Sequence, residues 1–298
     1  MNGVCVLHDH TSVSFFNKIR GDSSYIPAVG SCHCLFCLGD EGALHREGSV
    51  RFTVDTPDPE WIKAFDVKLE DRGARLMQTP LIREAQRGPD GLDLAAMREF
   101  LKQFRVCVIE PFYGWEILML NRVSAQMKNF GADVCVLLQD FLAANAREEQ
   151  FHDVWWTRFA GFWGVKPEEF GTVEINPIVA ELTHFVTEIA EKGSLVHAVL
   201  VVNYFIETVA ARLTAAVMPH LVRGMTSKQA QWPKVHCSGD PNHARDAREL
   251  LKRMVGPDED LEVLAAMLTV AADLFEAAIL AAYQRPAGSA PIAAAGAA

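Results

Sequence analysis

Three side chains that can bind a metal ion lie close together in residues 236–243. The Asp240 carboxylate follows the His236 imidazole by four residues, and His243 follows Asp240 by three. Side chains three and four residues apart share one face of a helix, so a helical conformation would point all three into one volume. The spacing therefore predicts part of a metal site, whose remaining ligands must come from elsewhere in the chain.

Two further segments of apolar sequence carry metal-binding side chains. Glu149 and His152 form an E-x-x-H pair one helical turn apart, a spacing that lets a carboxylate and an imidazole bind one ion. Glu207 lies within the apolar residues 202–211, where an unpaired charge would cost several kcal/mol. We therefore expect Glu207 to face a cation, a partner group or a cavity.

An earlier apolar and aromatic segment, residues 109–117, adds a glutamate that is either Glu110 or Glu116. Carboxylate and imidazole ligands without cysteine suit iron or manganese rather than a structural zinc site. About six or seven such ligands exceed the needs of one ion and fit a dinuclear centre. We predict no catalytic residue beyond the candidate ligands, which are Glu110, Glu116, Glu149, His152, Glu207, His236, Asp240 and His243.

A second E-x-x-H pair, Glu181 and His184, raises the alternative of a ferritin-like di-iron bundle. Ferritin-like chains normally present their ligands in the order Glu, E-x-x-H, Glu, E-x-x-H. Here the two E-x-x-H pairs are consecutive, and the arrangement leaves residues 236–243 unused. We therefore interpret Glu181 and His184 as a local surface or packing pair.

The composition excludes several classes of function. The chain has 298 residues, of which 50% are hydrophobic and 22% charged, as in a soluble globular protein. A net charge of -10 argues against nucleic-acid binding, and we find no membrane-spanning segment or signal peptide. Seven unevenly spaced cysteines favour a reduced, cytoplasmic protein. The expected partner is a small-molecule substrate, and a homodimer is left open.

The elements that would position these ligands are predicted to be helices. The sequence shows no internal repeat and no alternation of strands with helices, so the favoured fold class is an all-α bundle. Glycine and proline mark helix ends, as at Gly193. The predicted helices cover residues 81–87, 92–105, 106–127, 134–163, 177–192, 195–217, 243–254 and 258–283.

The chain divides into three predicted regions. Residues 1–60 form an extension of different composition, residues 61–284 the helical domain, and residues 285–298 a low-complexity tail that we expect to be disordered. Within the extension, residues 49–55 alternate like a short strand.

The extension also contains a cysteine cluster, Cys32, Cys34 and Cys37. A zinc site needs four ligands, and the cluster offers only a single C-x2-C. Free thiols are therefore favoured over a zinc site.

The order of the ligands resembles that of the heme-oxygenase-like di-iron oxidases and oxygenases. In this sequence a glutamate on an early helix is followed by Glu149 and His152, then by Glu207 55 residues after His152, and then by His-x3-Asp-x2-His. That family is related by fold to thiaminase II and pyrroloquinoline-quinone synthase. The resemblance covers roughly residues 75–260.

The resemblance implies a seven-helix bundle that holds two ferrous irons between core helices and uses O2. Glu116 fits the family's spacing to the ligand histidine, whereas Glu110 with Tyr113 resembles the acidic-x-x-Tyr pair of thiaminase-type pockets. The other ligand positions of the family match Glu149, His152, Glu207, His236, Asp240 and His243.

The proline at Pro241 departs from a regular helix. Proline disfavours helical backbone at the preceding residue, so we expect the last ligand helix to start near Asp240, with His236 on its lead-in. Metal-bearing helices of the family are often pliable, and the same is expected of this one.

The family oxidises small molecules by N-oxygenation, desaturation, oxidative C–C cleavage or decarboxylation. Because more of the family's members act on amino acids or their derivatives than on fatty acids, we expect an amino-acid-derived substrate. Arg122, Arg147, Arg158 and Arg212 are candidates for binding a substrate carboxylate. Candidate aromatic residues of the pocket are Tyr113, Trp115, Trp155, Trp156, Phe159 and Tyr204.

Two alternatives remain open. A metal-free thiaminase-type hydrolase of the same fold would use a cysteine nucleophile, for which Cys135 and Cys237 are available. Neither has a sequence context that marks a lowered pKa. A non-catalytic helical partner protein is the other alternative, but it would not need this many metal-binding groups on apolar helices.

Overall fold

The computed structural model describes Phe52 and residues 56–284. The predictions for the extension up to residue 51, including Cys32, Cys34 and Cys37, lie outside the described residues, and so does the predicted disordered tail. Of the predicted strand over residues 49–55, only Phe52 is described.

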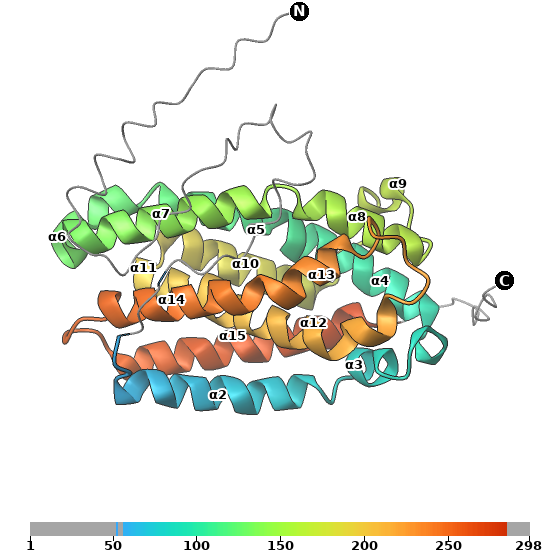
Figure 1. The fold of residues 1–298 in the computed structure, drawn as a ribbon, viewed down its shortest axis with the longest axis horizontal. Coiled ribbons are helices and arrows are strands. Elements are labelled where there is room, and N and C mark those ends of the chain that lie inside the picture. The colour runs from blue at the N-terminus through green and yellow to red at the C-terminus, as the bar shows by residue number, and fades with distance from the viewer. Residues whose placement is uncertain (1–51, 53–55, 285–298) are drawn as a thin grey trace, which may run out of the picture.

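The described chain folds into a bundle of long helices that run roughly along one axis (Figure 1). Its principal helices are α2 (Glu60–Leu76), α4 (Leu94–Phe104), α5 (Glu110–Leu120), α7 (Ala132–Glu149), α8 (His152–Phe162), α10 (Pro177–Lys192), α12 (Glu207–Leu221), α14 (Asp240–Met254) and α15 (Leu261–Ala282). Shorter helices are α3 (Pro80–Ala85), α6 (Met127–Phe130), α9 (Pro167–Phe170), α11 (Leu195–Ala198) and α13 (Gln231–Ser238). The predicted all-α bundle is confirmed.

Helix α10 begins and ends where the sequence predicts, whereas α4 begins at Leu94, two residues after its predicted start at residue 92. Asp93 caps α4 by accepting hydrogen bonds from the backbone N–H groups of Ala95 and Ala96. Asn176 caps α10 in the same way, and Gly193 ends that helix. Local side-chain chemistry therefore fixes the ends of these two elements.

The predicted helix over residues 134–163 is interrupted. It divides into α7 and α8 at Gln150 and Phe151, so Glu149 ends one helix and His152 begins the next. The E-x-x-H pair therefore does not share a continuous helical face. A change of direction at this junction brings the two side chains together instead.

The predicted helices over residues 106–127 and 195–217 both contain a π-helical segment. These segments are η3 (Arg105–Ile109), directly before α5, and η5 (Val199–Ile206), directly before α12. Helix α12 also continues through Pro219 to Leu221, beyond the predicted end. Single-turn π-helical segments are frequent at functional sites.

The last ligand-bearing segment follows the prediction drawn from Pro241. Helix α13 ends at Ser238 and α14 begins at Asp240, with Pro241 in its first turn, where proline is tolerated. His236 lies on α13, so Asp240 and His243 are the pair on one helix.

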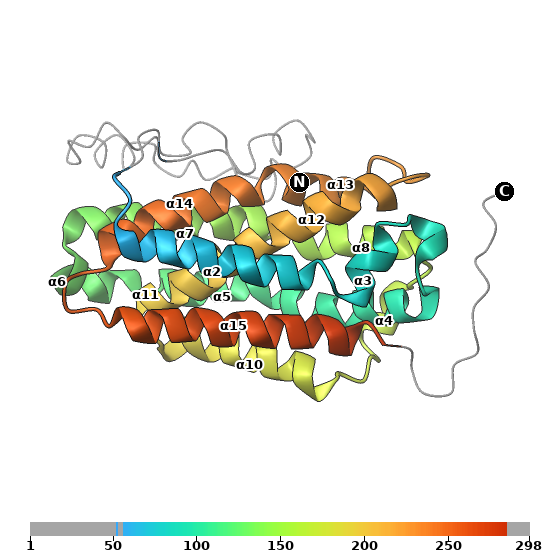
Figure 2. The same cartoon turned by 90° about the horizontal axis from the view of Figure 1, so that it is seen from below.

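The ligand-bearing helices pack against one another in the centre of the bundle. Helix α5 packs on α7, and α14 contacts α7, α12 and η5, while α13 contacts α8, α12 and α14. Figure 2 shows α14 and α13 on one side of the bundle and α10 and α15 on the opposite side. Side chains from these elements can therefore meet in the interior.

Two helical stretches are long and apolar enough to span a membrane by length and composition alone. These are Leu195–Leu221, whose most apolar stretch is 72% buried, and Leu261–Ala282, whose corresponding stretch is 39% buried. The first lies mostly in the core of the bundle.

Candidate metal centre

Two groups of buried acidic and imidazole side chains meet in the bundle core. The group of Glu149, His152 and His236, called the first group below, has ligand atoms within 4.8 Å of one another. The second group, Glu149, Glu207 and His243, meets the same limit. Because Glu149 belongs to both, the two groups form one continuous cluster.

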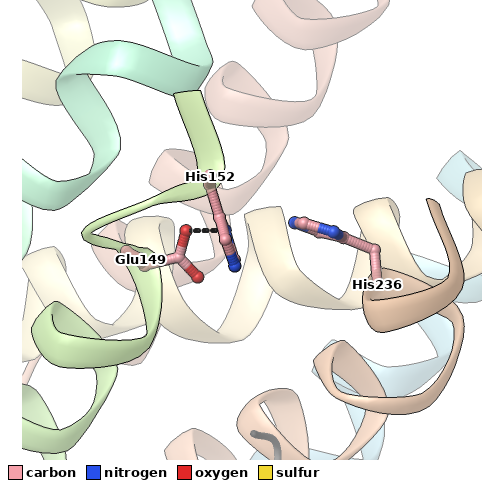
Figure 3. A group of neighbouring side chains, drawn as sticks. All are labelled: Glu149, His152 and His236. Carbon is pink, nitrogen blue, oxygen red and sulfur yellow. Dashed lines mark ion pairs between the residues drawn. The ribbon is translucent and has the colours of Figure 1, made fainter. Parts of the chain in front are cut away.

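In the first group, side chains from α7, α8 and α13 point toward one another (Figure 3). Glu149 contacts the Nδ1 atom of His152, and the rings of His152 and His236 lie 4.6 Å apart between centroids. The junction between α7 and α8 makes this approach possible, because it turns His152 toward the ring of His236.

Hydrogen bonding fixes which nitrogen of His236 faces the cluster. Its Nδ1 atom lies 2.7 Å from the carbonyl oxygen of Trp232, which can only accept, so Nδ1 carries the proton. The Nε2 lone pair is then available to a metal. Burial and the nearby His152 hold the pKa of His236 well below its usual range, so the ring is neutral, as a metal ligand requires.

His243 of the second group has the opposite arrangement. Its Nε2 atom lies 2.7 Å from Glu148 Oε2, and its Nδ1 atom lies 3.4 Å from Glu207 Oε1. An outer carboxylate that binds one ring nitrogen directs the other toward a metal. Burial opposes the charge of this ring, but Glu207 and Glu148 outweigh burial and raise the pKa of His243 well above its usual value.

Carboxylates gather densely around the second group. Glu116, Glu207 and Asp240 are at most 3% exposed. Burial raises the pKa of all three, and neighbouring carboxylates add to the effect. So many buried acids without a compensating cation carry a large electrostatic cost, which a bound metal would remove.

The two early-helix candidates differ in position. Glu116 is fully buried beside Glu207, Glu149 and His243. Glu110 is exposed and pairs with Arg105, which also contacts Asp153. The structure therefore places Glu110 outside the cluster, because it opens α5 on the side that faces solvent, and only Glu116 is retained as a candidate ligand.

The donor set fits iron. Two imidazoles and a carboxylate, as in the first group, are typical of non-heme ferrous sites, and the second group adds carboxylate oxygens that suit the same ion. Two further atoms are suited to bind a cation, since Glu116 Oε2 and Asp240 Oδ2 are buried and have no hydrogen-bond partner among the described residues.

An apolar cavity opens onto the first group. Glu149, His152, Glu207 and His236 form its polar end. No lysine or arginine of the described chain lines it. Its apolar wall includes Leu81, Ile82, Met97, Phe100, Phe104, Trp156, Phe159, Leu213, Val217 and Trp232.

The predictions for the pocket walls are confirmed for Trp156 and Phe159 only. Tyr113 is exposed, because it lies on the solvent side of α5. Trp115, Trp155 and Tyr204 are buried but do not line this cavity.

The four arginines proposed to bind a substrate carboxylate do not line the cavity either. Three of them have other partners: Arg122 donates to the carbonyl oxygens of Ala190 and Gly193. Arg212 donates to the carbonyl oxygen of Leu69, and Arg158 donates to Gln231 Oε1.

Three residues that matter here were not predicted from the sequence. Glu148 binds His243, Asn203 donates to Glu116 Oε1, and Trp232 stacks on His236 with ring centroids 3.9 Å apart. Asn203 precedes Glu207 by four residues in an apolar run, a buried-polar signal like the one that identified Glu207. The other two have no distinct signal in the sequence.

Residues 98–274, more than half of the chain, match the model of a family described as iron-containing redox enzymes. This protein belongs to that family. The match includes Glu116 and every candidate ligand after it, and it confirms the family resemblance drawn from the sequence. A comparison with curated proteins finds no match to this chain.

Two solved structures have the fold of this iron-containing redox enzyme. A TenA homologue from Pseudomonas syringae pv. tomato is 20% identical, with a TM-score of 0.66 over 78% of this chain and 97% of the homologue. A domain of unknown function with a heme oxygenase-like fold, from Shewanella denitrificans, is 16% identical, with a TM-score of 0.60 over 74% of this chain and 91% of the domain. The fold is therefore heme-oxygenase-like.

Proposed function

We propose that this protein is an O2-dependent non-heme di-iron oxidase or oxygenase. The observation that carries the proposal is the pair of buried ligand groups that share Glu149. A carboxylate common to two adjacent groups can bridge two ions, which is the arrangement of a dinuclear centre.

The proposed residues divide the work of binding. His152 and His236 would hold one ferrous ion, Glu207 and His243 the other, and Glu149 both. Glu116 and Asp240, which lie near Glu207, Glu149 and His243, would supply further oxygen ligands at the second group. When bound, the two irons would supply the electrons that activate O2.

The chain itself contributes orientation and exclusion of water. Trp232 fixes the ring of His236 by stacking on it, and its carbonyl oxygen accepts a hydrogen bond from the Nδ1–H group of His236. Glu148 holds the Nε2 proton of His243. The apolar cavity wall keeps bulk water from the open side of the first group, where a substrate would lie.

The apolar lining of the cavity favours a substrate with a large apolar portion. An amino-acid-derived substrate would bring charged groups into a cavity that has no cationic side chain among its described walls. We therefore favour the second candidate function, oxidation of a fatty acid or similar amphiphile whose polar end reaches the metal. Saturated fatty acids should raise the melting temperature of the iron-loaded protein, and free amino acids should not.

The thiaminase-type alternative finds little support in the thiols. Burial raises the pKa of both Cys135 and Cys237, which lowers the fraction of reactive thiolate. Neither cysteine lines the apolar cavity.

Anaerobic loading with ferrous iron tests the proposal directly. The protein should bind about two irons per chain, and Glu207→Ala and His243→Ala should abolish turnover while the helical circular dichroism persists. One tightly bound zinc, or no metal, would refute the di-iron function. The matched pair Glu116→Ala and Glu110→Ala sharpens the test, since only the first should reduce iron binding.

We also propose that the enzyme is cytoplasmic and acts on a small molecule. The reduced cysteine chemistry and the absence of a basic face in the composition support this setting.

A further inference from the structure

A buried amide next to the second group has no role in the proposed ligand set. Asn203 is fully buried in η5, one turn before Glu207. Its Nδ2 group donates a hydrogen bond to Glu116 Oε1. Burying an amide in an apolar helix is costly unless it is bonded, so the contact with Glu116 gives this residue a function.

The hydrogen bond makes the two carboxylate oxygens of Glu116 different from each other. Oε1 is occupied by Asn203, whereas Oε2 has no hydrogen-bond partner among the described residues. Glu116 comes from α5 and Asn203 from η5, so the bond also joins the helix that carries Glu116 to the segment that leads directly into Glu207 at the start of α12. A carboxylate held in this way presents one defined oxygen.

We propose that Asn203 is a positioning residue that makes Glu116 a one-oxygen ligand of the second metal. With Oε1 held by the amide, Glu116 reaches the metal through Oε2 alone and leaves a coordination position open. Without the amide, Glu116 would be free to bind through both oxygens or to turn away. This inference rests on the proposed metal centre.

A second buried asparagine provides a matched control. Asn145 is also fully buried, and it precedes Glu149 by four residues on α7, as Asn203 precedes Glu207. Its side chain makes no hydrogen bond to Glu116 or to any other described residue. Asn203→Leu and Asn145→Leu therefore remove the same group from equivalent positions, and only the first removes the bond to Glu116.

Cobalt(II) is a suitable probe, because its visible absorption reports coordination number independently of turnover. In Asn203→Leu the affinity for the second cobalt should fall by about 10- to 100-fold, as for other residues that orient metal ligands. The absorption band of that cobalt should also shift in position and intensity. Asn145→Leu should retain the wild-type affinity and spectrum, and circular dichroism of all three proteins should agree. Asn203→Ala removes the same amide without added bulk, and replaces the leucine variant if that variant does not fold.

The outcomes separate this inference from the proposed function. If the wild-type protein binds no second cobalt, the dinuclear centre itself is wrong. If the wild type binds two and Asn203→Leu keeps both affinity and spectrum, Asn203 does not position Glu116. Equal changes in Asn203→Leu and Asn145→Leu would also overturn the inference, since they would show a general effect of buried polarity.

Discussion

The two ligand groups share Glu149 but have different surroundings. The first group, with His152 and His236, forms the polar end of an apolar cavity and is bordered by aromatic rings. The second group, with Glu207 and His243, lies among carboxylates and hydrogen-bonding side chains. The first group is therefore open to a molecule in the cavity, whereas the second group is enclosed by protein side chains.

This difference assigns separate tasks to the two proposed irons. A ligand group that faces a cavity can admit a substrate, whereas a group enclosed by outer carboxylates holds its ion in a fixed geometry. His243 does not line the cavity, although Glu207 does. The first iron would therefore be the one that contacts the substrate. The second would mainly add positive charge to the cluster and hold the shared Glu149 in position.

Removing the shared ligand should have the largest effect. Glu149→Ala should weaken binding of both irons by at least about 100-fold, more than the loss of an outer residue, and should abolish activity. Iron analysis and turnover measure both effects. Glu181→Ala, in the exposed E-x-x-H pair, is the control and should leave iron content unchanged. Loss of only one iron in Glu149→Ala would show that this carboxylate is not shared.

Removing the outer carboxylate should affect one side of the cluster only. Glu148→Ala should lower the affinity for the second iron by about 10- to 100-fold. The affinity for the first iron should stay the same, because Glu148 binds His243 and not His236. Stepwise anaerobic titration with ferrous iron measures the two affinities. Glu148→Gln retains an acceptor oxygen and should lose less. Equal weakening of both irons would contradict the separation of the groups.

Filling the cavity should weaken substrate binding without changing iron binding. Ala210→Phe introduces a ring next to the polar end of the cavity and should lower kcat/KM by about 10- to 200-fold. Iron content should stay at the wild-type level. Ala211→Phe, at the next position but not lining the cavity, is the matched control. Unchanged kcat/KM in Ala210→Phe would mean that the substrate binds elsewhere.

The smallest effect concerns the charge of the two histidines in the metal-free protein. Glu207 and Glu148 raise the pKa of His243, so this ring should stay protonated as the pH rises through 6.5, the ordinary pKa of a histidine. Burial lowers the pKa of His236, so that ring should stay neutral as the pH falls through the same value. Nitrogen-15 NMR of the imidazoles between pH 5.5 and 7.5, roughly one unit either side of that value, measures both. Two rings that titrate together would remove the electrostatic difference between the groups.

The sequence was sufficient for the fold class and for most of the acidic and imidazole side chains that meet in the core. Buried charge in apolar helices identified Glu207, and the spacing of residues 236–243 identified a helix that starts at Asp240, because Pro241 allows few other backbones. The ligand role of these residues stays a prediction until a metal is measured. Caps such as Asp93 and Asn176 were predictable because their chemistry is local.

The rest depended on tertiary packing. The junction at Gln150 and Phe151 and the two π-helical segments have no strong local signal, so the sequence suggested continuous helices. The choice between Glu110 and Glu116 also needed the structure. Both lie in one apolar segment and on one helix, α5, and only the side of the helix that each occupies distinguishes them. The substrate expectation came from the distribution of family members, and the apolar cavity points away from it.

The stacking of Trp232 on His236 gives the protein an internal optical reporter. Paramagnetic iron quenches the fluorescence of a nearby indole, and this indole lies against the ring that would hold the first iron. Trp155 lies beside the ring of His152, with centroids 5.0 Å apart. Loading of the proposed metal centre can therefore be followed by intrinsic emission, in real time and without a label.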